Sequence, residues 1–452
     1  MSAGPRVEVV NFGCRLNLAE GEAVRAAALR AGAADTIVFN SCAVTDEAVR
    51  QARQAVRRAL RERPGADVVV TGCAAELEAQ RFADMGARVV ANDAKGLAES
   101  YRSKDKNGAS PRLDPGSART DLDDGAISSP FALNLSKPVL SACKAVEGGR
   151  SSLPYTPALS GADHARAFLG VQTGCSHDCT FCATVLARGA ARSAPVDAIL
   201  AAARTAIDRG QREIVLTGVD LASYGDDSGT SLAALAEALL ALPGLDRLRL
   251  SSLDPDRIDA ALFALLTQEA RVMPHVHLSL QAGDDMVLRR MKRRHRRADA
   301  VRLVERLKAA RPAIAIGADL IAGFPTEDAG MFANTLALVD DCDIVFGHIF
   351  PYSPRAGTPA ARMPQVGRAV ARERAARLRE ANARRRHAWM DARRGRIAAM
   401  LVERDGVSGH GEDFTALTLA APAAPGSIVP VRIGARDGER MAATRIDKDG
   451  TA

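Results

Sequence analysis

The amino-acid sequence predicts an α/β protein with an N-terminal parallel α/β domain, a central partial (β/α)6 barrel and a small C-terminal β-barrel. Two observations support this prediction. Short apolar segments alternate with helical segments in residues 1–100 and again from residue 164 to about 355, which is typical of parallel sheets covered by helices. After residue 397 the pattern changes to short β-like pieces separated by glycine and proline. A chain of 452 residues is also too long for a single core.

The N-terminal region contains three strand–helix units, each followed by a cysteine. Strands are expected at residues 7–12, 36–40 and 67–71, and helices at 16–30, 46–63 and 74–82. Cys14, Cys42 and Cys73 come shortly after the three strands. The carboxyl ends of parallel strands share one edge of a sheet, so we expect these three thiols to converge in space. The alternative is three unrelated buried thiols.

Between residues 100 and 163 the periodic pattern gives way to glycine, serine, proline and charged residues, as in a linker or excursion. The predicted domain boundaries are therefore 1–100, 101–160 (the linker), 161–390 and 391–449. We interpret Cys143, inside the linker, and Cys342, at a strand entrance, as spare thiols.

The central region is expected to form six β/α repeats. Strands are predicted at 167–172, 213–219, 247–253, 275–281, 314–320 and 344–349, and helices near 196–209, 232–242, 255–269, 284–310 and 327–339. A barrel of this kind has its working end at the carboxyl ends of its strands. A cysteine-rich loop follows the first of these strands, at that end.

This loop carries Cys175, Cys179 and Cys182 in a C-x3-C-x2-C run. Thiolates are the natural ligands of a 4Fe–4S cluster, and three of them leave the fourth iron open to another molecule. Cys14, Cys42 and Cys73 form a second set of three thiols, which would also leave the fourth iron of a cluster without a cysteine ligand. A structural zinc site needs four ligands, so a Cys3His site that includes His177 is the alternative for the loop.

Charge and composition indicate which kind of partner the protein binds and where in the cell it is expected. The formal net charge is +7, and the positive charge is concentrated in residues 289–297 and in an arginine-rich helix expected at 368–396. Such patches favour a polyanion such as RNA, although a solvated helix face has the same composition. The chain lacks a run of eighteen apolar residues and a signal peptide, so we expect a cytoplasmic protein that does not enter a membrane.

The cysteine loop resembles the cluster motif of the radical S-adenosylmethionine (SAM) enzymes, and further motifs resemble those of the methylthiotransferases within that superfamily. These motifs are Asn40-Ser41-Cys42-Ala43-Val44-Thr45, Thr71-Gly72-Cys73-Ala74, Gln172-Thr173-Gly174-Cys175, Leu216-Thr217-Gly218-Val219-Asp220, His277-Leu278-Ser279-Leu280-Gln281-Ala282-Gly283, Gly323-Phe324-Pro325 and Pro351-Tyr352-Ser353-Pro354-Arg355-Ala356-Gly357-Thr358. The resemblance implies a radical-SAM partial barrel in the centre and a TRAM-like C-terminal domain.

The resemblance also implies roles for both thiol sets. Cys175, Cys179 and Cys182 would hold the radical-generating 4Fe–4S cluster, which binds SAM and cleaves it to a 5′-deoxyadenosyl radical. Cys14, Cys42 and Cys73 would hold an auxiliary 4Fe–4S cluster whose open iron carries the sulfur to be delivered. One SAM methylates that sulfur and a second yields the radical. Candidate SAM contacts, which are equally plausible as core or turn residues, are Thr217, Gly218, Ser252, Gln281 and Asp319.

Within the family, the motifs look most like the branch that methylthiolates N6-threonylcarbamoyladenosine at position 37 of tRNA. The expected partners are a tRNA anticodon stem-loop and a flavodoxin- or ferredoxin-like electron donor. The isopentenyladenosine branch usually has Gln-Asn-Val-Asn where this chain has Gly218-Val219-Asp220-Leu221. The alternatives that remain open are a methylthiotransferase that acts on isopentenyladenosine at position 37 of tRNA or on an aspartate of a ribosomal protein, and a non-catalytic iron–sulfur or zinc protein that binds RNA.

Overall fold

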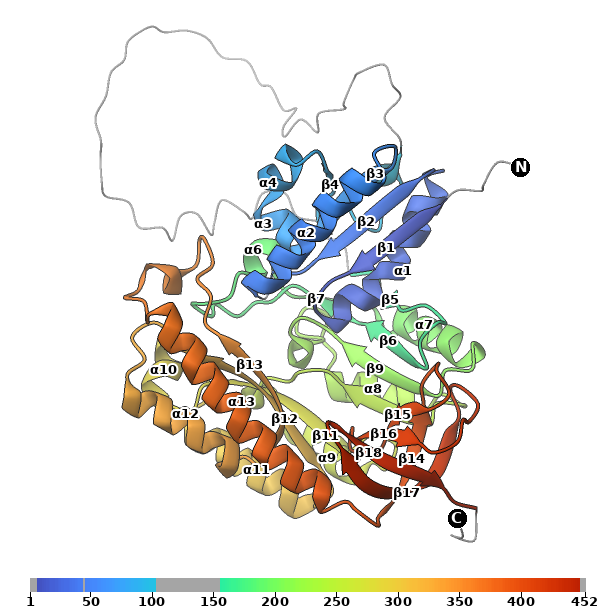
Figure 1. The fold of residues 1–452 in the computed structure, drawn as a ribbon. Helices are drawn as coiled ribbons and strands as arrows, with labels where there is room; N and C mark the ends of the chain where they lie inside the picture. The colour runs from blue at the N-terminus through green and yellow to red at the C-terminus, as the bar shows by residue number, and fades with distance from the viewer. Residues whose placement is uncertain (1–5, 44, 103–154, 448–452) are drawn as a thin grey trace, which may run out of the picture.

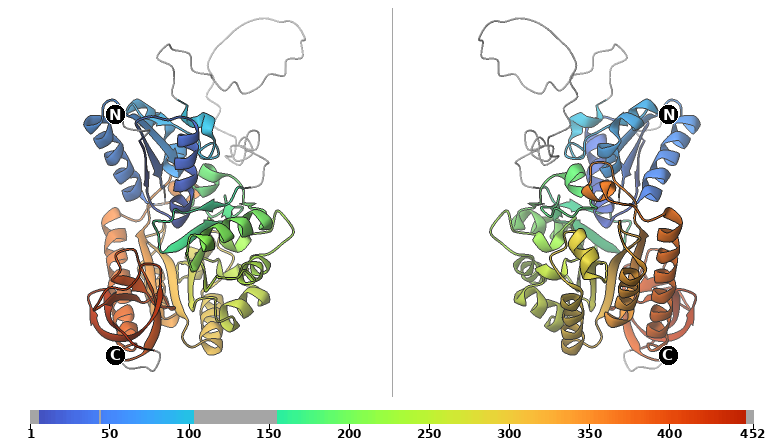
Figure 2. Two further views of the ribbon diagram at one scale, coloured as in Figure 1. Left: turned by 90° about the vertical axis from the view of Figure 1, so that its right-hand side faces the viewer. Right: turned by 90° about the vertical axis from the view of Figure 1, so that its left-hand side faces the viewer.

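The computed structural model of the protein describes residues 6–43, 45–102 and 155–447 (Figure 1). Most of the predicted linker, including Cys143, lies outside the described residues. The N-terminal domain sits against one end of the central domain, and the C-terminal barrel lies at the opposite end (Figures 1 and 2). None of the helices in the described part of the chain is long and apolar enough to cross a membrane.

The N-terminal domain is a three-layer α/β unit. Its parallel strands run in the order β1-β2-β3-β4, and they comprise β1 (Val7–Asn11), β2 (Thr36–Ser41), β3 (Asp67–Gly72) and β4 (Arg88–Val89). The helices are α1 (Arg15–Arg30), α2 (Asp46–Glu62), α3 (Cys73–Leu77) and α4 (Ala79–Asp84). Apolar residues of α1 pack on one face of the sheet, and those of α2 and α4 pack on the other.

The first two expected strand–helix units of this domain are confirmed. In the third unit the strand is confirmed, but the single helix expected at residues 74–82 is wrong, because the chain leaves the helical conformation at Glu78 and forms α3 and α4 instead. Thr45 caps α2, because its side-chain oxygen accepts a hydrogen bond from the backbone N–H of Ala48 (3.1 Å). Asn11, Asn40 and Thr71 are register partners across β1, β2 and β3, so the three strands end side by side.

The central domain is a partial barrel built from two sheets. One has the order β10-β9-β6-β5 and the other β11-β12-β13. The strands are β5 (Ala158–Leu159), β6 (Arg166–Gly170), β9 (Glu213–Thr217), β10 (Arg247–Leu250), β11 (His275–Gln281), β12 (Ala315–Ala322) and β13 (Ile344–Pro351). Isolated bridges, Leu248 with Val272 and Leu253 with Leu278, connect the two sheets. All six predicted strands are present, and one large apolar cluster fills the layers between them and the helices.

Helices cover the outside of the partial barrel, and a small hairpin of β7 (Gln172–Thr173) and β8 (Arg192–Ser193) flanks the cysteine loop. The helices are α6 (Thr184–Arg188), α7 (Val196–Asp208), α8 (Leu232–Leu240), α9 (Ala260–Gln268), α10 (Asp285–Arg290), α11 (Arg297–Ala310), α12 (Ala329–Asp341) and α13 (Arg368–Asp391). The described residues before the C-terminal domain also form short 3-10 turns, which are η1 (Ala98–Tyr101), η2 (Leu221–Ser223), η3 (Pro255–Arg257) and η4 (Pro359–Arg362).

The prediction of one helix over residues 284–310 was wrong. The segment forms α10 and α11, and between them Lys292 has a φ of 58°, a left-handed conformation that an α-helix does not accommodate. The break turns Arg293 inward, where it pairs with Asp254 at 2.8 Å. The basic run by itself is compatible with one continuous helix. The buried ion pair between Arg293 and Asp254 accounts for the break between α10 and α11.

The C-terminal domain is a closed five-stranded barrel in the order β14-β15-β16-β18-β17. Its strands are β14 (Ile397–Val402), β15 (Ser408–His410), β16 (Ala416–Leu419), β17 (Ile428–Asp437) and β18 (Arg440–Arg445). The β-like pieces expected after residue 397 are therefore confirmed as strands of one barrel. Trp389 and Met390, at the end of α13, pack into the same apolar cluster as the barrel interior and so anchor the barrel to the central domain.

Candidate functional site

The structure brings Cys14, Cys42 and Cys73 to one edge of the N-terminal sheet, as the sequence predicts. Cys42 and Cys73 directly follow β2 and β3, and Cys14 immediately precedes α1. A methyl group placed on Gly13 would lie 2.4 Å from the sulfur of Cys42, so the loop before Cys14 presses against the second thiol. Cys14 also interacts electrostatically with Cys73 and with Arg188.

The turn that precedes Cys73 requires a glycine at position 72. Its φ is +89°, and a Cβ there would lie 2.3 Å from the carbonyl oxygen of Ser41. Only glycine fits such a close backbone approach in the left-handed region. The Ser41 hydroxyl donates to Thr71 O at 2.6 Å and accepts from the Ala75 N–H at 3.0 Å, which fixes the turn that presents Cys73.

Arg188 connects this edge to the central domain. Its Nε donates to the Cys73 sulfur (3.2 Å), and its two terminal nitrogens contact the two carboxylate oxygens of Glu20 at 3.0 Å each. Lys95 donates to the same carboxylate at 2.6 Å. Burial opposes ionisation of Glu20, but Arg188 and Lys95 outweigh that effect and lower its pKa to about 2. The sequence offered no local signal for this network, because its members lie far apart in the chain.

The loop with Cys175, Cys179 and Cys182 lies between β7 and α6, at the carboxyl end of the partial barrel. The Thr184 N–H points at Cys182 (3.4 Å), the His177 N–H at Cys175 (3.4 Å), and Arg293 Nη1 at Cys179 (3.5 Å). Burial raises the pKa of both Cys175 and Cys179, so binding of a metal there must displace thiol protons.

Neither thiol set is arranged around a single ion. Thiolates around one tetrahedral zinc lie about 3.8 Å apart, since Zn–S bonds are about 2.3 Å. In the described part of the chain, the one group of three potential ligand side chains with all ligand atoms within 4.8 Å of one another contains no cysteine. His177, which the zinc alternative needs as its fourth ligand, instead has its Nε2 2.9 Å from Asp220.

Both sets fit a cluster in which each thiolate binds a different iron. N–H donors point at sulfurs of both sets, at Cys73 in the first and at all three thiols of the loop in the second. Such donors stabilise the negative charge of a bound cluster. Cys175, Cys179 and Cys182 would hold one 4Fe–4S cluster, and Cys14, Cys42 and Cys73 a second.

Four of the five candidate SAM contacts lie at the carboxyl ends of barrel strands. Thr217 ends β9, Gly218 follows it, Ser252 comes just after β10, and Gln281 ends β11 with a φ of 67°. Gly218 lies so close to the Gln172 side chain that a Cβ would be 2.8 Å from its Oε1. These four positions surround the same end of the barrel as the cysteine loop.

Asp319 lies deeper, within β12, and is held by two histidines. Its Oδ1 is 3.1 Å from His277 Nε2 and 3.3 Å from His348 Nδ1. Burial opposes ionisation of Asp319, but the two histidines lower its pKa. These three side chains form the group within 4.8 Å mentioned above, and two histidines with one carboxylate can ligate a metal. The nearby guanidinium of Arg15 interacts with Asp319 and opposes a further positive charge.

Phe414, from the C-terminal barrel, closes the opposite end of the central domain. Its ring stacks on His275 (5.0 Å between centroids) and on His410 (4.8 Å). The guanidinium groups of Arg15, Arg166 and Arg249 lie 5.3–5.6 Å from its centroid. Its φ of 70° is strained for a bulky side chain. All three domains therefore meet at this one ring, which the sequence did not single out.

Comparisons with known proteins agree with this geometry. Residues 169–339 match the model of the radical SAM superfamily, and residues 6–91 match that of the uncharacterized protein family UPF0004. The chain is 38% identical to the threonylcarbamoyladenosine tRNA methylthiotransferase MtaB of Rickettsia prowazekii, over 94% of this chain and 93% of that protein. It is 31% identical to the tRNA-2-methylthio-N(6)-dimethylallyladenosine synthase of Erythrobacter litoralis, over 88% and 86% of the two chains.

Among solved structures, the radical SAM methyltransferase TsrM of Kitasatospora setae, with tryptophan and a SAM analog bound, is similar in fold. The TM-score is 0.51 at 14% identity, over 78% of this chain and 74% of that chain. At this level of identity the similarity concerns the fold alone.

Proposed function

Because the chain belongs to the radical SAM methylthiotransferase family, we propose that it converts N6-threonylcarbamoyladenosine at position 37 of tRNA to its 2-methylthio derivative. The support for this substrate is the relative of that name, which matches at 38% identity over nearly the whole of both chains. The motifs around Cys42 and Asp220, which resemble the same branch, point in the same direction.

The proposed chemistry uses SAM and two 4Fe–4S clusters. SAM and one such cluster are the cofactors of the superfamily to which residues 169–339 belong. When bound, the Cys175–Cys182 cluster supplies the electron that cleaves SAM, and the auxiliary cluster supplies the sulfur. A one-electron donor of the flavodoxin or ferredoxin class would reduce the radical cluster. Radical chemistry is needed because the adenine C2–H is neither acidic nor electrophilic enough for polar substitution.

The protein's own side chains would hold and insulate these centres. Arg293 donates to Cys179 and is itself held by Asp254, while Arg188 donates to Cys73 and is held by Glu20. Each thiol set thus has a buried arginine that is fixed by a buried carboxylate. The observation that carries the proposal is this pairing of two thiol sets, each one ligand short of four, in one molecule.

Iron content tests the two-cluster part of the proposal. After anaerobic reconstitution we expect about eight irons per chain, because each cluster has four. Cys179→Ala should lose about half of the iron and all SAM cleavage. Cys342→Ala removes a buried thiol outside both sets and should keep full iron and full SAM cleavage. A zinc-containing protein, or SAM turnover that survives in Cys179→Ala, would contradict the proposal.

The nucleosides of cellular tRNA test the substrate. In a strain lacking this protein, mass spectrometry should show that the methylthio group disappears from threonylcarbamoyladenosine while the unmodified precursor accumulates. The wild-type gene should restore the modification, and the Cys179→Ala gene should not. Loss from isopentenyladenosine instead would assign the chain to the branch of the Erythrobacter litoralis relative.

A further inference from the structure

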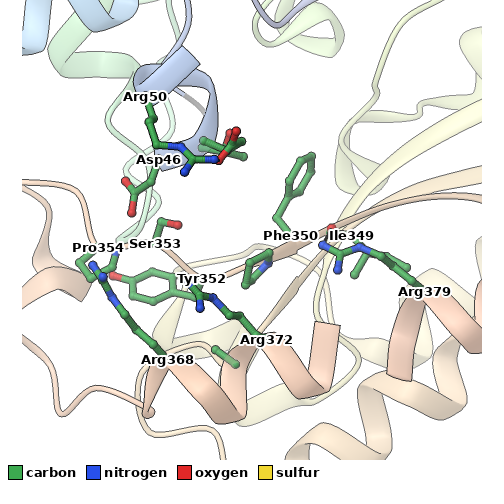
Figure 3. Close-up of a pocket in the computed structure, with 14 residues that line it drawn as sticks. Asp46, Arg50, Ile349, Phe350, Tyr352, Ser353, Pro354, Arg368, Arg372 and Arg379 are labelled. Atoms are coloured by element: carbon green, nitrogen blue, oxygen red, sulfur yellow. Dashed lines mark hydrogen bonds and ion pairs between the residues drawn. The ribbon is translucent and has the colours of Figure 1, made fainter. Parts of the chain in front are cut away.

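A cleft of about 570 Å³ separates α2 of the N-terminal domain from α13 of the central domain (Figure 3). Its lining comes from the first turn of α2, from the end of β13 with the residues that follow it, and from one face of α13. α2 begins shortly after Cys42, and β13 ends at the carboxyl edge of the barrel. The cleft therefore lies beside the end of the molecule at which both thiol sets are found.

The cleft has a surplus of positive charge. Its two acidic residues are already paired, Asp46 with Arg355 (2.7 Å) and Glu47 with Arg50. Three further arginines line the α13 side: Arg368, Arg372 and Arg379. Arg379 donates to the carbonyl of Ile349, and Arg368 and Arg372 are exposed with no acidic partner within the described residues. An anionic ligand would thus meet two guanidinium groups that have no competing carboxylate.

An aromatic ring also faces the cleft. Phe350 is partly exposed and projects between the α2 side and the α13 side (Figure 3). Within the described residues its ring stacks on no other aromatic ring and on no arginine. The neighbouring Tyr352 is fixed against Phe324, with centroids 5.5 Å apart, and its buried hydroxyl has no hydrogen-bond partner there. The aromatic face of Phe350 is therefore available to a ligand.

Free cations beside a free aromatic face match the chemistry of an unpaired nucleotide. Its phosphates bind guanidinium groups, and its base stacks on an aromatic ring when it is not stacked in a helix. Double-stranded RNA has no exposed base face to offer. The volume falls within the range of roughly 300–1,000 Å³ for small-molecule sites, so one nucleotide can be accommodated.

We propose that this cleft binds an unstacked loop nucleotide of the RNA substrate, beside the base that reacts, with its base on Phe350 and its phosphate on Arg368 and Arg372. The inference rests on the proposed function, because it assumes that RNA is the substrate. Beyond the proposed function, the inference names the site that holds a neighbouring nucleotide while the target base enters the space near the thiol sets.

Binding of an anticodon stem-loop RNA to the reconstituted protein tests the site. The RNA carries 2-aminopurine next to the target position, so that stacking quenches its fluorescence. Phe350→Leu should weaken binding about 5- to 150-fold and abolish the quenching. Phe350→Tyr keeps an aromatic face and should preserve both.

Salt dependence separates a phosphate contact from a general charge effect. Arg372→Gln should reduce the slope of log K against log salt by about 0.7, the value for one phosphate contact in a single strand. Arg384→Gln removes the same charge from the same helix, but Arg384 pairs with Glu380 outside the cleft, so its slope should equal that of the wild type.

The outcomes distinguish the two proposals. If the wild type binds the stem-loop and Phe350→Leu binds it equally well with full quenching, the cleft is not the nucleotide site, although the proposed function stands. If the wild type does not bind the stem-loop at all, the proposed substrate fails. Poly-glutamate binding that depends on Arg372 but not on Phe350 would assign the cleft to an acidic protein and overturn the inference.

Discussion

The guanidinium Nε of Arg188 lies 3.2 Å from the sulfur of Cys73, although the two residues belong to different domains. Arg188 ends α6, directly after the loop of the radical cluster, and Cys73 begins α3 in the N-terminal domain. Glu20 and Lys95 complete a buried network around this contact. The interface between the domains thus has an ionic centre located at one of the proposed clusters.

Arg188→Gln should destabilise the protein by about 3 kcal/mol, because it leaves the buried Glu20 carboxylate with Lys95 alone. Arg188→Lys keeps the charge but not the bidentate contact, so its loss should be smaller. Anaerobic thermal and urea unfolding measure the effect. Arg58→Gln, from an exposed pair with Glu62, should change stability by less than about 1 kcal/mol. Equal stability of Arg188→Gln and the wild type would show that the network is not a stabilising contact.

The same network predicts a pH dependence. The pKa of Glu20 is about 2 in the folded protein and near 4.5 in an unfolded chain. A depressed carboxylate pKa stabilises the fold above the unfolded value, and this contribution is lost as the pH falls from about 4.5 towards 2. The stability difference between the wild-type apoprotein and Glu20→Gln, on the order of 3 kcal/mol, should therefore be full at pH 6 and shrink below pH 4.5. A difference that does not change between pH 6 and pH 3 would contradict the assignment.

Gly72→Ala should disrupt the auxiliary site. The added methyl group would lie 2.3 Å from Ser41 O and 2.7 Å from Ser41 N, and backbone atoms cannot move away as a flexible side chain could. We expect Cys73 to be displaced, with loss of about half of the reconstituted iron but retention of SAM cleavage. Gly65→Ala is the matched control, because a Cβ there has nothing within 4 Å. Full iron in Gly72→Ala would show that the turn tolerates a side chain.

Phe414→Ala should loosen the C-terminal barrel. The ring contacts two histidines and three arginines from all three domains, and alanine removes these contacts. The expected cost is about 2–3 kcal/mol, less than the roughly 3–5 kcal/mol of a fully buried phenylalanine because Phe414 is partly exposed. Limited proteolysis after α13 should become faster. Ile397→Ala, at a side chain that is 60% exposed, should leave the cleavage rate unchanged.

The sequence was sufficient for the fold and for the family. Alternation of apolar and helical segments predicted the parallel strands, and the position of Cys14, Cys42 and Cys73 after those strands predicted that they converge. The resemblance to radical SAM methylthiotransferases was confirmed by relatives that match nearly the full chain. These inferences succeeded because they depend on local periodicity and on the common direction of parallel strands.

The parts that could not be predicted depend on pairings between distant residues. The partnership of Arg188 with Glu20 and Cys73, and that of Arg293 with Asp254, have no local pattern. Arg293 also explains the wrong helix at residues 284–310, because a tertiary ion pair overrode a sequence that favours helix. Phe414 was missed for the same reason: its partners come from three domains, and its φ of 70° is one that a phenylalanine rarely adopts.

Helix α6 is only five residues long, Thr184–Arg188, yet it joins the last thiol of one set to the guanidinium that touches the other. An α-helix advances about 1.5 Å and turns about 100° per residue. Inserting or deleting one residue here would swing Arg188 away from Cys73 by more than a quarter of a revolution. The number of residues in α6 therefore determines how the first thiol set is positioned relative to Cys73 of the second set.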